Sequence, residues 1–396
     1  MKGRSALFLL LAVVFQCLGP LAVFVPRALP LVLGILSIAG IAIEWRNGNL
    51  RAVFRLNGIQ ISLFLLFALA LASSLWSLDG GLTLTRAGRL GLFLLPILAL
   101  PRMARRVTDG EKDILWPIFA GSWAGAVLLM VEEHFMGHPI FHMGKGLAFD
   151  APLEDSVTNQ PLIILGLLLW PVAIHYFSKG PKWNGLLFPL AATALLLPLT
   201  SQSAALAMAV ATLALVVGFV SARAMRRLWL AISLMGCVAV VPIAMLPWRW
   251  GWANCGWLMD SARHRVEIWY FSAVAVLQRP FLGHGLETSS LLRSDDGNWR
   301  FLGKSIQVMD HPHNLFLQVW LELGFAGAFL MLLFFIALYR NLRRMDLVRQ
   351  PHVWAALFFV VTAASAGFGA WQSWWLAAIC FMALLLMMEK EHGKQT

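Results

Sequence analysis

Charged residues are scarce in this chain of 396 residues: they make up 13% of it, whereas soluble domains carry about 25%. Hydrophobic residues make up 59% and gather in runs of roughly 18 to 22, the length that crosses a bilayer core of about 30 Å. This shortage of charge excludes a soluble globular protein. Because no backbone group can stay unpaired in lipid, every span is expected to be a helix, and the predicted fold is an all-α polytopic membrane protein.

Cysteine is also scarce. Of the four cysteines, Cys17, Cys237 and Cys380 fall in apolar runs and Cys255 stands alone, so no disulfide framework is implied. The first apolar run follows basic residues, as in a signal peptide, but no small-residue cleavage site comes after it. We therefore predict an uncleaved first helix.

The apolar runs predict about twelve transmembrane helices within one membrane domain, residues 1–396. They are expected, within a few residues, at 6–25, 28–44, 59–77, 86–101, 114–131, 159–177, 184–199, 203–220, 228–246, 315–338, 353–367 and 371–388. The interiors of these runs are almost free of charge, with Glu322 as the main exception.

A net charge of +11 would suit a nucleic-acid partner, but its distribution argues against one. If the N-terminus is cytoplasmic, most of the 31 basic residues fall in the cytoplasmic segments, as the positive-inside rule requires. We therefore expect a multi-pass protein with both termini in the cytoplasm, bilayer lipids as its neighbours and no nucleic-acid partner.

Two long connections are expected on the outer, periplasmic side. The smaller covers 132–158, and the larger, 247–314, is too long for a simple link, so it should be partly helical. The larger loop carries basic residues against the positive-inside trend, among them Arg263 and Arg265. They suit an anionic ligand, although long loops also cross the membrane regardless of charge.

One helix is predicted inside the larger loop, before the tenth span. It should run from about 260 to 277, with Asp260 or Ser261 as its N-cap. Arg265 and Trp269 are four residues apart and therefore share one face of this helix.

A titratable polar pair, His313-Asn314, stands at the outer mouth of the span at 315–338. Asp310 is expected to cap this helix and Pro312 to lie in its first turn. The helix dipole would then disfavour an imidazolium at His313 and leave a neutral ring that can accept a proton. His313 is thus a candidate general base; the alternative is an interfacial histidine without a role.

Two glycines follow on the same helix. Gly324 comes eleven residues after His313 and returns to nearly the same face, with Gly327 close by. Small residues let a neighbouring helix approach closely, so this stripe is expected to turn His313 into the bundle.

The pattern over 313–327, His-Asn, nine residues and then Gly-x-x-Gly, resembles the signature of the O-antigen ligase and polymerase family. That family's second motif has an Arg shortly before a Trp, then a Pro, then Gly-x-Gly. It is matched here by Arg265, Trp269, Pro280, Gly283 and Gly285. The specific resemblance covers about 263–327, and the span count and large outer loop agree with it.

The resemblance implies an integral membrane glycosyltransferase, free of metal and nucleotide, at the periplasmic face of the bacterial inner membrane. The donor would be a glycan on undecaprenyl diphosphate, and the acceptor a hydroxyl of lipid A–core or of another glycan repeat. Three residues would be catalytic. Arg265 would bind the diphosphate through its planar guanidinium, His313 would activate the acceptor hydroxyl, and Asn314 would orient the histidine or the sugar.

Further polar residues near the outer helix mouths are expected to bind substrate: Arg86, Arg89, Asn159, Gln202, Arg263, Trp269 and His311. Arg86 and Arg89 would open the fourth span, where a helix N-terminus favours anions. Many members of the family carry more arginines at the central helix mouths, where this chain has Asn159 and Gln202. The departure implies a different donor or a compensating role for Arg86 or Arg89.

No cofactor is predicted. Three histidines, His134, His138 and His142, have the spacing of metal ligands on a helix, but Gly137 and Pro139 would break that helix. We therefore predict no metal site.

Three functions compete. A ligase is favoured slightly over a polymerase of the same family, because a compact Arg-Trp helix precedes the His motif. The third is a transporter without catalysis, which is disfavoured because such proteins place charges near the bilayer midplane.

Overall fold

The computed structural model describes residues 5–148, 156–177, 183–199, 202–292, 300–301, 304–305 and 311–389. The first helices are α1 (Ala6–Phe24), α2 (Leu29–Arg46), α3 (Leu50–Val53), α4 (Gly58–Ala72), α5 (Gly80–Gly91), α6 (Leu94–Arg106), α7 (Asp109–Phe135), α8 (Pro139–Lys145) and α9 (Ser156–Phe177). The later ones are α10 (Asn184–Leu196), α11 (Gln202–Val220), α12 (Ala222–Leu234), α13 (Val240–Arg249), α14 (Asp260–Gln278), α15 (Leu315–Leu342), α16 (Gln350–Ala366) and α17 (Ser373–Met388).

Short elements join these helices. The 3-10 turns are η1 (Pro26–Ala28), η2 (Ser73–Leu75), η3 (Leu197–Leu199), η5 (Trp252–Asn254) and η6 (Ser289–Leu291), and η4 (Met235–Ala239) is a π-helical turn. Two antiparallel strands, β1 (Arg300–Phe301) and β2 (Lys304–Ser305), pair Arg300 with Ser305.

The predicted all-α polytopic fold is confirmed. Within the described residues, nine helical segments are long and apolar enough to cross a membrane, and α10 and α17 are shorter apolar helices. The remaining predicted span coincides with α16, which has 17 residues. The helix expected in the larger loop is α14, which begins and ends within a residue of its predicted bounds.

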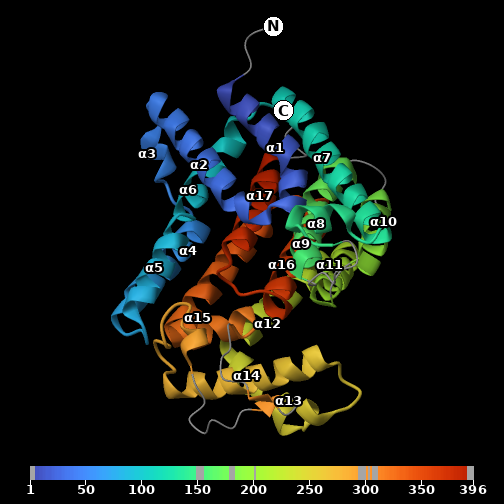
Figure 1. Ribbon diagram of the computed structural model, residues 1–396. Helices are drawn as coiled ribbons and strands as arrows, with labels where there is room; N and C mark the ends of the chain where they lie inside the picture. Colours follow the sequence, from blue (N-terminus) through green and yellow to red (C-terminus); the bar gives the residue numbers. More distant parts are fainter. Residues whose placement is uncertain are drawn as a thin grey trace.

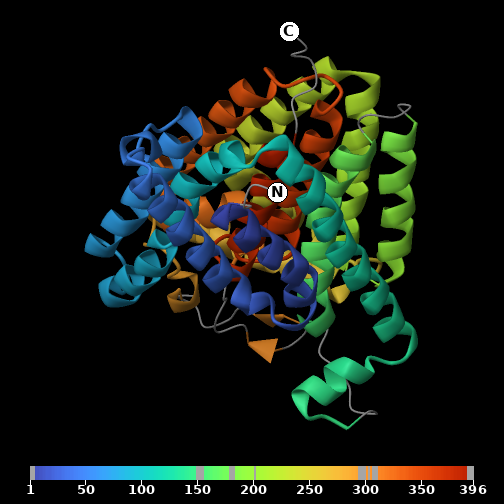
Figure 2. The same cartoon turned by 90° about the horizontal axis from the view of Figure 1, so that it is seen from above.

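The helices form one bundle with α14 lying across one end. In Figure 1 the start of α1 and the end of α17 lie at the top, whereas α14 crosses beneath the bundle. Seen from above, the blue helices α3 to α5 and the light-green helices α10 and α11 occupy opposite flanks, with α17 between them (Figure 2). The bundle therefore has two distinct ends, and the residues around α14 belong to the end remote from both α1's start and α17's finish.

The centre of the bundle is α9, in which every residue from Leu162 to Ile174 is buried. It packs against α1, α16 and α17, and α11 packs along α16. Gly166 lets the Met208 sulfur and the Phe359 ring come close to the α9 backbone. Most other spans bury half of their residues or fewer, as expected for helices that face lipid.

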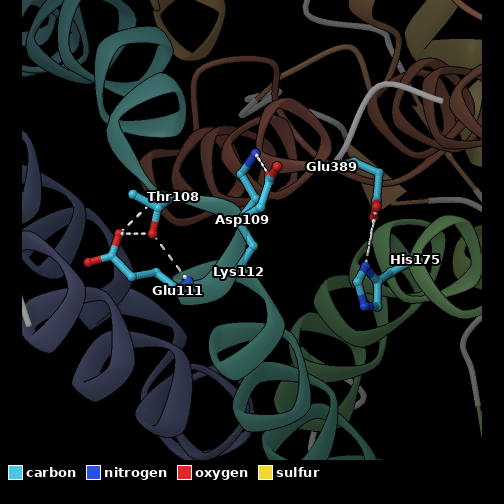
Figure 3. Close-up of polar contacts among 6 residues, drawn as sticks. All are labelled: Thr108, Asp109, Glu111, Lys112, His175 and Glu389. Carbon is cyan, nitrogen blue, oxygen red and sulfur yellow. Dashed lines mark hydrogen bonds and ion pairs between the residues drawn. The ribbon is translucent and has the colours of Figure 1, made fainter. Parts of the chain in front are cut away.

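Polar contacts close the bundle at the end where α7 begins (Figure 3). Thr108 caps α7 by accepting a hydrogen bond from Glu111 N, and the Glu111 carboxylate accepts one from Thr108 N in return. At the same end, His175 of α9 contacts the Glu389 carboxylate just after α17, at 3.0 Å. The ends of α9 and α17 are therefore tied together.

The π-helical turn η4 packs against the first turns of α15. A π-turn frees a backbone carbonyl from the α-helical ladder, and the Cys237 carbonyl accepts a hydrogen bond from Trp320 Nε1 at 2.8 Å. A Cβ at Gly236 would lie 2.6 Å from Phe316 Cδ1, so only glycine admits this ring. The first turns of α15, directly after His313, are fixed against α12 and α13.

Three local predictions are wrong. Asn314, not Asp310, caps α15: its Oδ1 accepts a hydrogen bond from Leu317 N at 3.1 Å. Pro312 therefore precedes the helix, and Asp310 lies outside the described residues. Met259 rather than Asp260 or Ser261 stands at the N-cap of α14.

Candidate functional site

The two glycine motifs meet backbone to backbone. Gly324 has φ 62° and ψ −158°, which breaks α15 into two helical parts. A Cβ at Gly324 would lie 2.6 Å from Leu282 N, and one at Gly283 would lie 2.6 Å from Leu323 N. Both positions have positive φ, so glycine is required twice over.

Four backbone hydrogen bonds hold this junction together. They run from His284 N to Leu321 O, Gly285 N to Glu322 O, Phe325 N to Pro280 O and Ala326 N to Phe281 O, at 2.8–3.1 Å. The expectation that Gly324 and Gly327 form a stripe for a neighbouring helix is therefore wrong. Gly324 receives the 280–285 turn, and Gly327 makes room for Val319 and Leu323 of the preceding part of the same kinked helix.

A third segment, residues 73–78, also packs against the 280–285 turn. The Gly285 backbone lies against Ser77, whose Cα would be 2.9 Å from a Cβ at that position. Leu78 N donates to His284 O at 3.1 Å, and Leu286 N donates to Ser73 Oγ at 3.1 Å. The His284 imidazole is buried and contacts Ala275 O through Nε2, and burial lowers its pKa. The turn is thereby held between α15, α14 and the 73–78 segment.

Glu322 is the hub behind this turn. Its carboxylate is fully buried and accepts four hydrogen bonds, from Gln318 Nε2 (2.9 Å), Ser289 Oγ (3.1 Å), Glu287 N (2.8 Å) and Trp371 Nε1 (2.7 Å). A buried carboxylate is tolerated only when it is satisfied in this way. The four donors bind α15, the turn and the connection before α17 into one unit.

The arginine helix α14 is joined directly to the His motif. Trp269 Nε1 donates a hydrogen bond of 3.0 Å to Pro312 O, the residue before His313. Arg265 lies one turn earlier on the same face of α14 and donates from Nη1 to Ser261 O at 3.4 Å. The two sequence motifs therefore lie side by side in the folded chain.

His313 adopts an unusual backbone conformation and is oriented by one carbonyl. Its φ is 51°, a left-handed value that is uncommon outside glycine. Its Nδ1 lies 3.0 Å from Gly367 O, which can only accept, so Nδ1 is assigned the proton and Nε2 of the neutral ring holds the lone pair. The centroid of the His311 ring lies 4.1 Å from that of the His313 ring, so the two imidazoles lie together at the start of α15.

Gln202 completes a ring of contacts. It begins α11 and contacts α14 twice, accepting from Ser261 Oγ at 2.8 Å and approaching the Met259 sulfur at 3.1 Å. The neighbouring Ser203 lies against Gly367, within 3.2 Å of the position a Cβ would take there. Ser261 thus links Arg265 to Gln202, and Gly367 links Ser203 to His313. Trp269 joins α14 to the residue before His313.

Two arginines and a carboxyl share α14. Burial lowers the pKa of Arg265, and Arg263 lies 3.7 Å from Asp260. Glu267 follows Arg263 by one turn and is buried; burial raises the pKa of its carboxyl to about 7, and attraction to Arg263 offsets part of this. Among the described residues, Glu267 Oε2 has no hydrogen-bond partner.

The other predicted substrate-binding residues are spread more widely. Arg86 forms an ion pair with Glu287, so part of its charge is already neutralised. Arg89 is exposed on α5. The helix α5 begins at Gly80, so neither arginine opens the span as expected. Asn159 lies in the first turn of α9.

Three residues of this site are not predicted from the sequence. Glu322 is predicted only as a charge inside a span, although Gln318, four residues earlier, indicates a partner on the same helix face. Glu267 has no predicted role, and its spacing from Arg263 is the signal that could have indicated one. Glu287 had no signal, because its partner Arg86 lies about 200 residues away. Among the described residues, no cluster of three potential metal ligands is found.

Known proteins resemble part of this chain. Residues 186–332 match a family model described as O-antigen ligase. A Rickettsia prowazekii protein is 31% identical over 139 residues, and one from Rickettsia typhi is 30% identical over 139 residues; both are named "Putative polysaccharide ligase". Each match spans 33% of this chain and 33% of the relative. Over residues 186–332, which include the arginine helix and the His motif, the chain is similar to the O-antigen ligase family, and it spans about a third of the length of the relatives that it matches.

Proposed function

We propose that this protein is a membrane glycosyltransferase that moves a glycan from undecaprenyl diphosphate to a hydroxyl of lipid A–core. The active site would face the periplasm, with both termini in the cytoplasm of a bacterial inner-membrane protein. The observation that carries the proposal is the hydrogen bond from Trp269 to Pro312, because it sets the Arg265 helix against His313.

The chemistry follows from the two side chains. His313 Nε2 accepts the proton of the acceptor hydroxyl, whose oxygen attacks the anomeric carbon of the donor sugar. The bond from that carbon to the diphosphate breaks, and its electron pair leaves with the diphosphate. Arg265 neutralises this developing charge, and its partial burial strengthens the attraction. Attack opposite the leaving group inverts the anomeric centre.

The remaining residues position these groups. The Gly367 carbonyl orients the His313 ring through Nδ1, and Nε2 is proposed to face the acceptor hydroxyl. Asn314 caps α15 and fixes the backbone that follows His313, a positioning role. Gln202, Arg263, Trp269 and His311 are proposed to contact sugar or diphosphate oxygens. Arg86 and Arg89 are proposed to bind the donor from α5.

Purified protein with a synthetic polyprenyl-diphosphate glycan and lipid A–core tests the proposal. His313→Ala is expected to lower the transfer rate by about 10²–10⁴, the usual contribution of a general base. His134→Ala, an exposed histidine at the end of α7, serves as the matched control and should transfer at the normal rate. A His313→Ala protein that consumes donor normally contradicts the catalytic assignment.

A deletion strain separates ligase from polymerase. Loss of a ligase leaves full-length polymer on undecaprenyl diphosphate. Accumulation of single lipid-linked repeats would instead identify a polymerase, and the donor site described above would serve that reaction unchanged.

A further inference from the structure

Four arginines converge at the end of α15 remote from His313. Together they line a cavity of about 380 Å³ with one leucine and one tyrosine: Arg223, Arg226, Arg227, Leu230, Tyr339 and Arg343. Three arginines come from the first two turns of α12, and Arg343 directly follows α15. This group, called the arginine pocket below, takes no part in the proposed reaction.

The pocket has a rigid frame. Met225 and Trp229 of α12 lie in one buried cluster with Phe335 and Leu342 of α15. The Trp229 and Phe335 rings meet edge to face at 5.4 Å. The arginines are therefore brought together by packing between two segments more than 100 residues apart.

No acidic side chain in the described part of the chain forms an ion pair with these arginines. Among the residues that the structure describes, their one polar side-chain contact is from Arg226 Nη1 to Gln350 Oε1, at 3.4 Å. Arg223, Arg227 and Arg343 are exposed, and Arg226 is half-buried. The cavity thus gathers four positive charges, and none of the described residues that line it is acidic.

The position of the charges on α12 is unfavourable by itself. Arg223 stands three and four residues before Arg226 and Arg227, and like charges at these spacings destabilise a helix by about 0.2–0.5 kcal/mol per pair. They also lie near the N-terminus of α12, where the helix dipole is already positive and the first turn holds no acidic residue. A bound anion would relieve both effects.

Membrane topology alone does not explain why these four arginines line one cavity. The positive-inside rule counts basic residues in a loop and needs no convergence on one cavity. Here two separate segments supply guanidinium groups around the same space, and Arg is the side chain whose planar fork binds two phosphate oxygens at once.

We propose that the arginine pocket binds a phosphate group, and that Leu230 and Tyr339 favour one carried by a membrane lipid. The site lies at the end of apolar spans, where a lipid headgroup and the upper part of its chains reach both the arginines and these two side chains. A soluble phosphate compound shares the same headgroup chemistry and is distinguished by experiment.

Native mass spectrometry of the purified full chain tests this proposal with three probes: phosphatidylglycerol, diacylglycerol and inorganic phosphate. Phosphatidylglycerol is expected to bind at least about tenfold more tightly than diacylglycerol, which has the chains without the phosphate. Equal binding of the two lipids overturns the proposal. If inorganic phosphate displaces phosphatidylglycerol at equal concentration, the phosphate site stands and its ligand is a soluble compound.

The decisive variant replaces Arg223, Arg226, Arg227 and Arg343 by lysine together. Lysine keeps the positive charge and the membrane topology, but it cannot bind two phosphate oxygens in a bidentate way. The affinity for phosphatidylglycerol should therefore fall about tenfold or more. Arg340→Lys with Arg344→Lys, on neighbouring exposed positions outside this pocket, is the matched control and should bind within about twofold of the parent. Unchanged affinity in the four-lysine protein refutes the pocket, and Arg343→Lys alone should give a smaller loss in the same direction.

Discussion

Gly324→Ala should destabilise the protein by about 2–6 kcal/mol, because two independent effects act at that residue. Its φ of 62° and ψ of −158° lie in a region that only glycine populates, and strain of this kind costs about 1–3 kcal/mol. The new Cβ would also lie 2.6 Å from Leu282 N, a backbone atom that cannot rotate away.

The second effect comes from the hydrogen bonds at the junction. To admit the methyl group, the 280–285 turn must move away from α15, and the four bonds between them lengthen. Each contributes about 0.5–1.5 kcal/mol, so weakening two of them adds about 1–3 kcal/mol. Gly283→Ala strikes the same junction from the opposite side and should behave alike.

Thermal unfolding followed by tryptophan fluorescence, together with the transfer assay, checks this prediction. Gly88→Ala is the matched control: Gly88 is exposed on α5, no atom lies within 4 Å of its added Cβ, and alanine favours a helix by about 1 kcal/mol over glycine. A Gly324→Ala protein that unfolds at the same temperature as the parent and keeps full activity would refute the predicted strain at this residue.

Three further predictions follow from the site. Trp269→Phe removes the donor to Pro312 O and should lower kcat about tenfold with less than about 1 kcal/mol lost in stability; an unchanged kcat speaks against the α14 contact. Burial raises the pKa of Glu267 to about 7, so the folded state binds the proton more tightly, and stability should fall as pH rises from about 4.5 to 7; melting curves of Glu267→Gln should lack this slope. Arg86→Glu and Glu287→Arg should each destabilise the protein, and the double exchange should recover most of the melting temperature; strictly additive losses would rule out coupling.

Hydropathy predicted the spans, and local sequence predicted the extent of α14, although not its cap residue. Both depend on local composition: apolar runs of bilayer length mark the spans, and Pro280 follows the end of the α14 pattern. The pairing of Arg265 with Trp269 on one face followed from helical periodicity alone.

The kink at Gly324 could not be predicted from periodicity. An eleven-residue spacing places Gly324 over His313 only in an unbroken helix, and the backbone at Gly324 is not helical. What turns the chain there is the 280–285 segment, a contact made across about 40 residues of sequence. The N-cap at Asn314 could have been predicted from the sequence, because an asparagine directly before an apolar run is a common helix start.

The shared hydrogen bonds between the 280–285 turn and the kink of α15 bear on protein engineering. The 280–285 turn and the kink of α15 each depend on the other for their backbone conformation, so the two segments should be exchanged together. A chimera that takes residues 260–327 together from a homologue should fold. Exchange of the 280–285 turn or of the α15 kink alone would leave backbone amides of the junction without their acceptors.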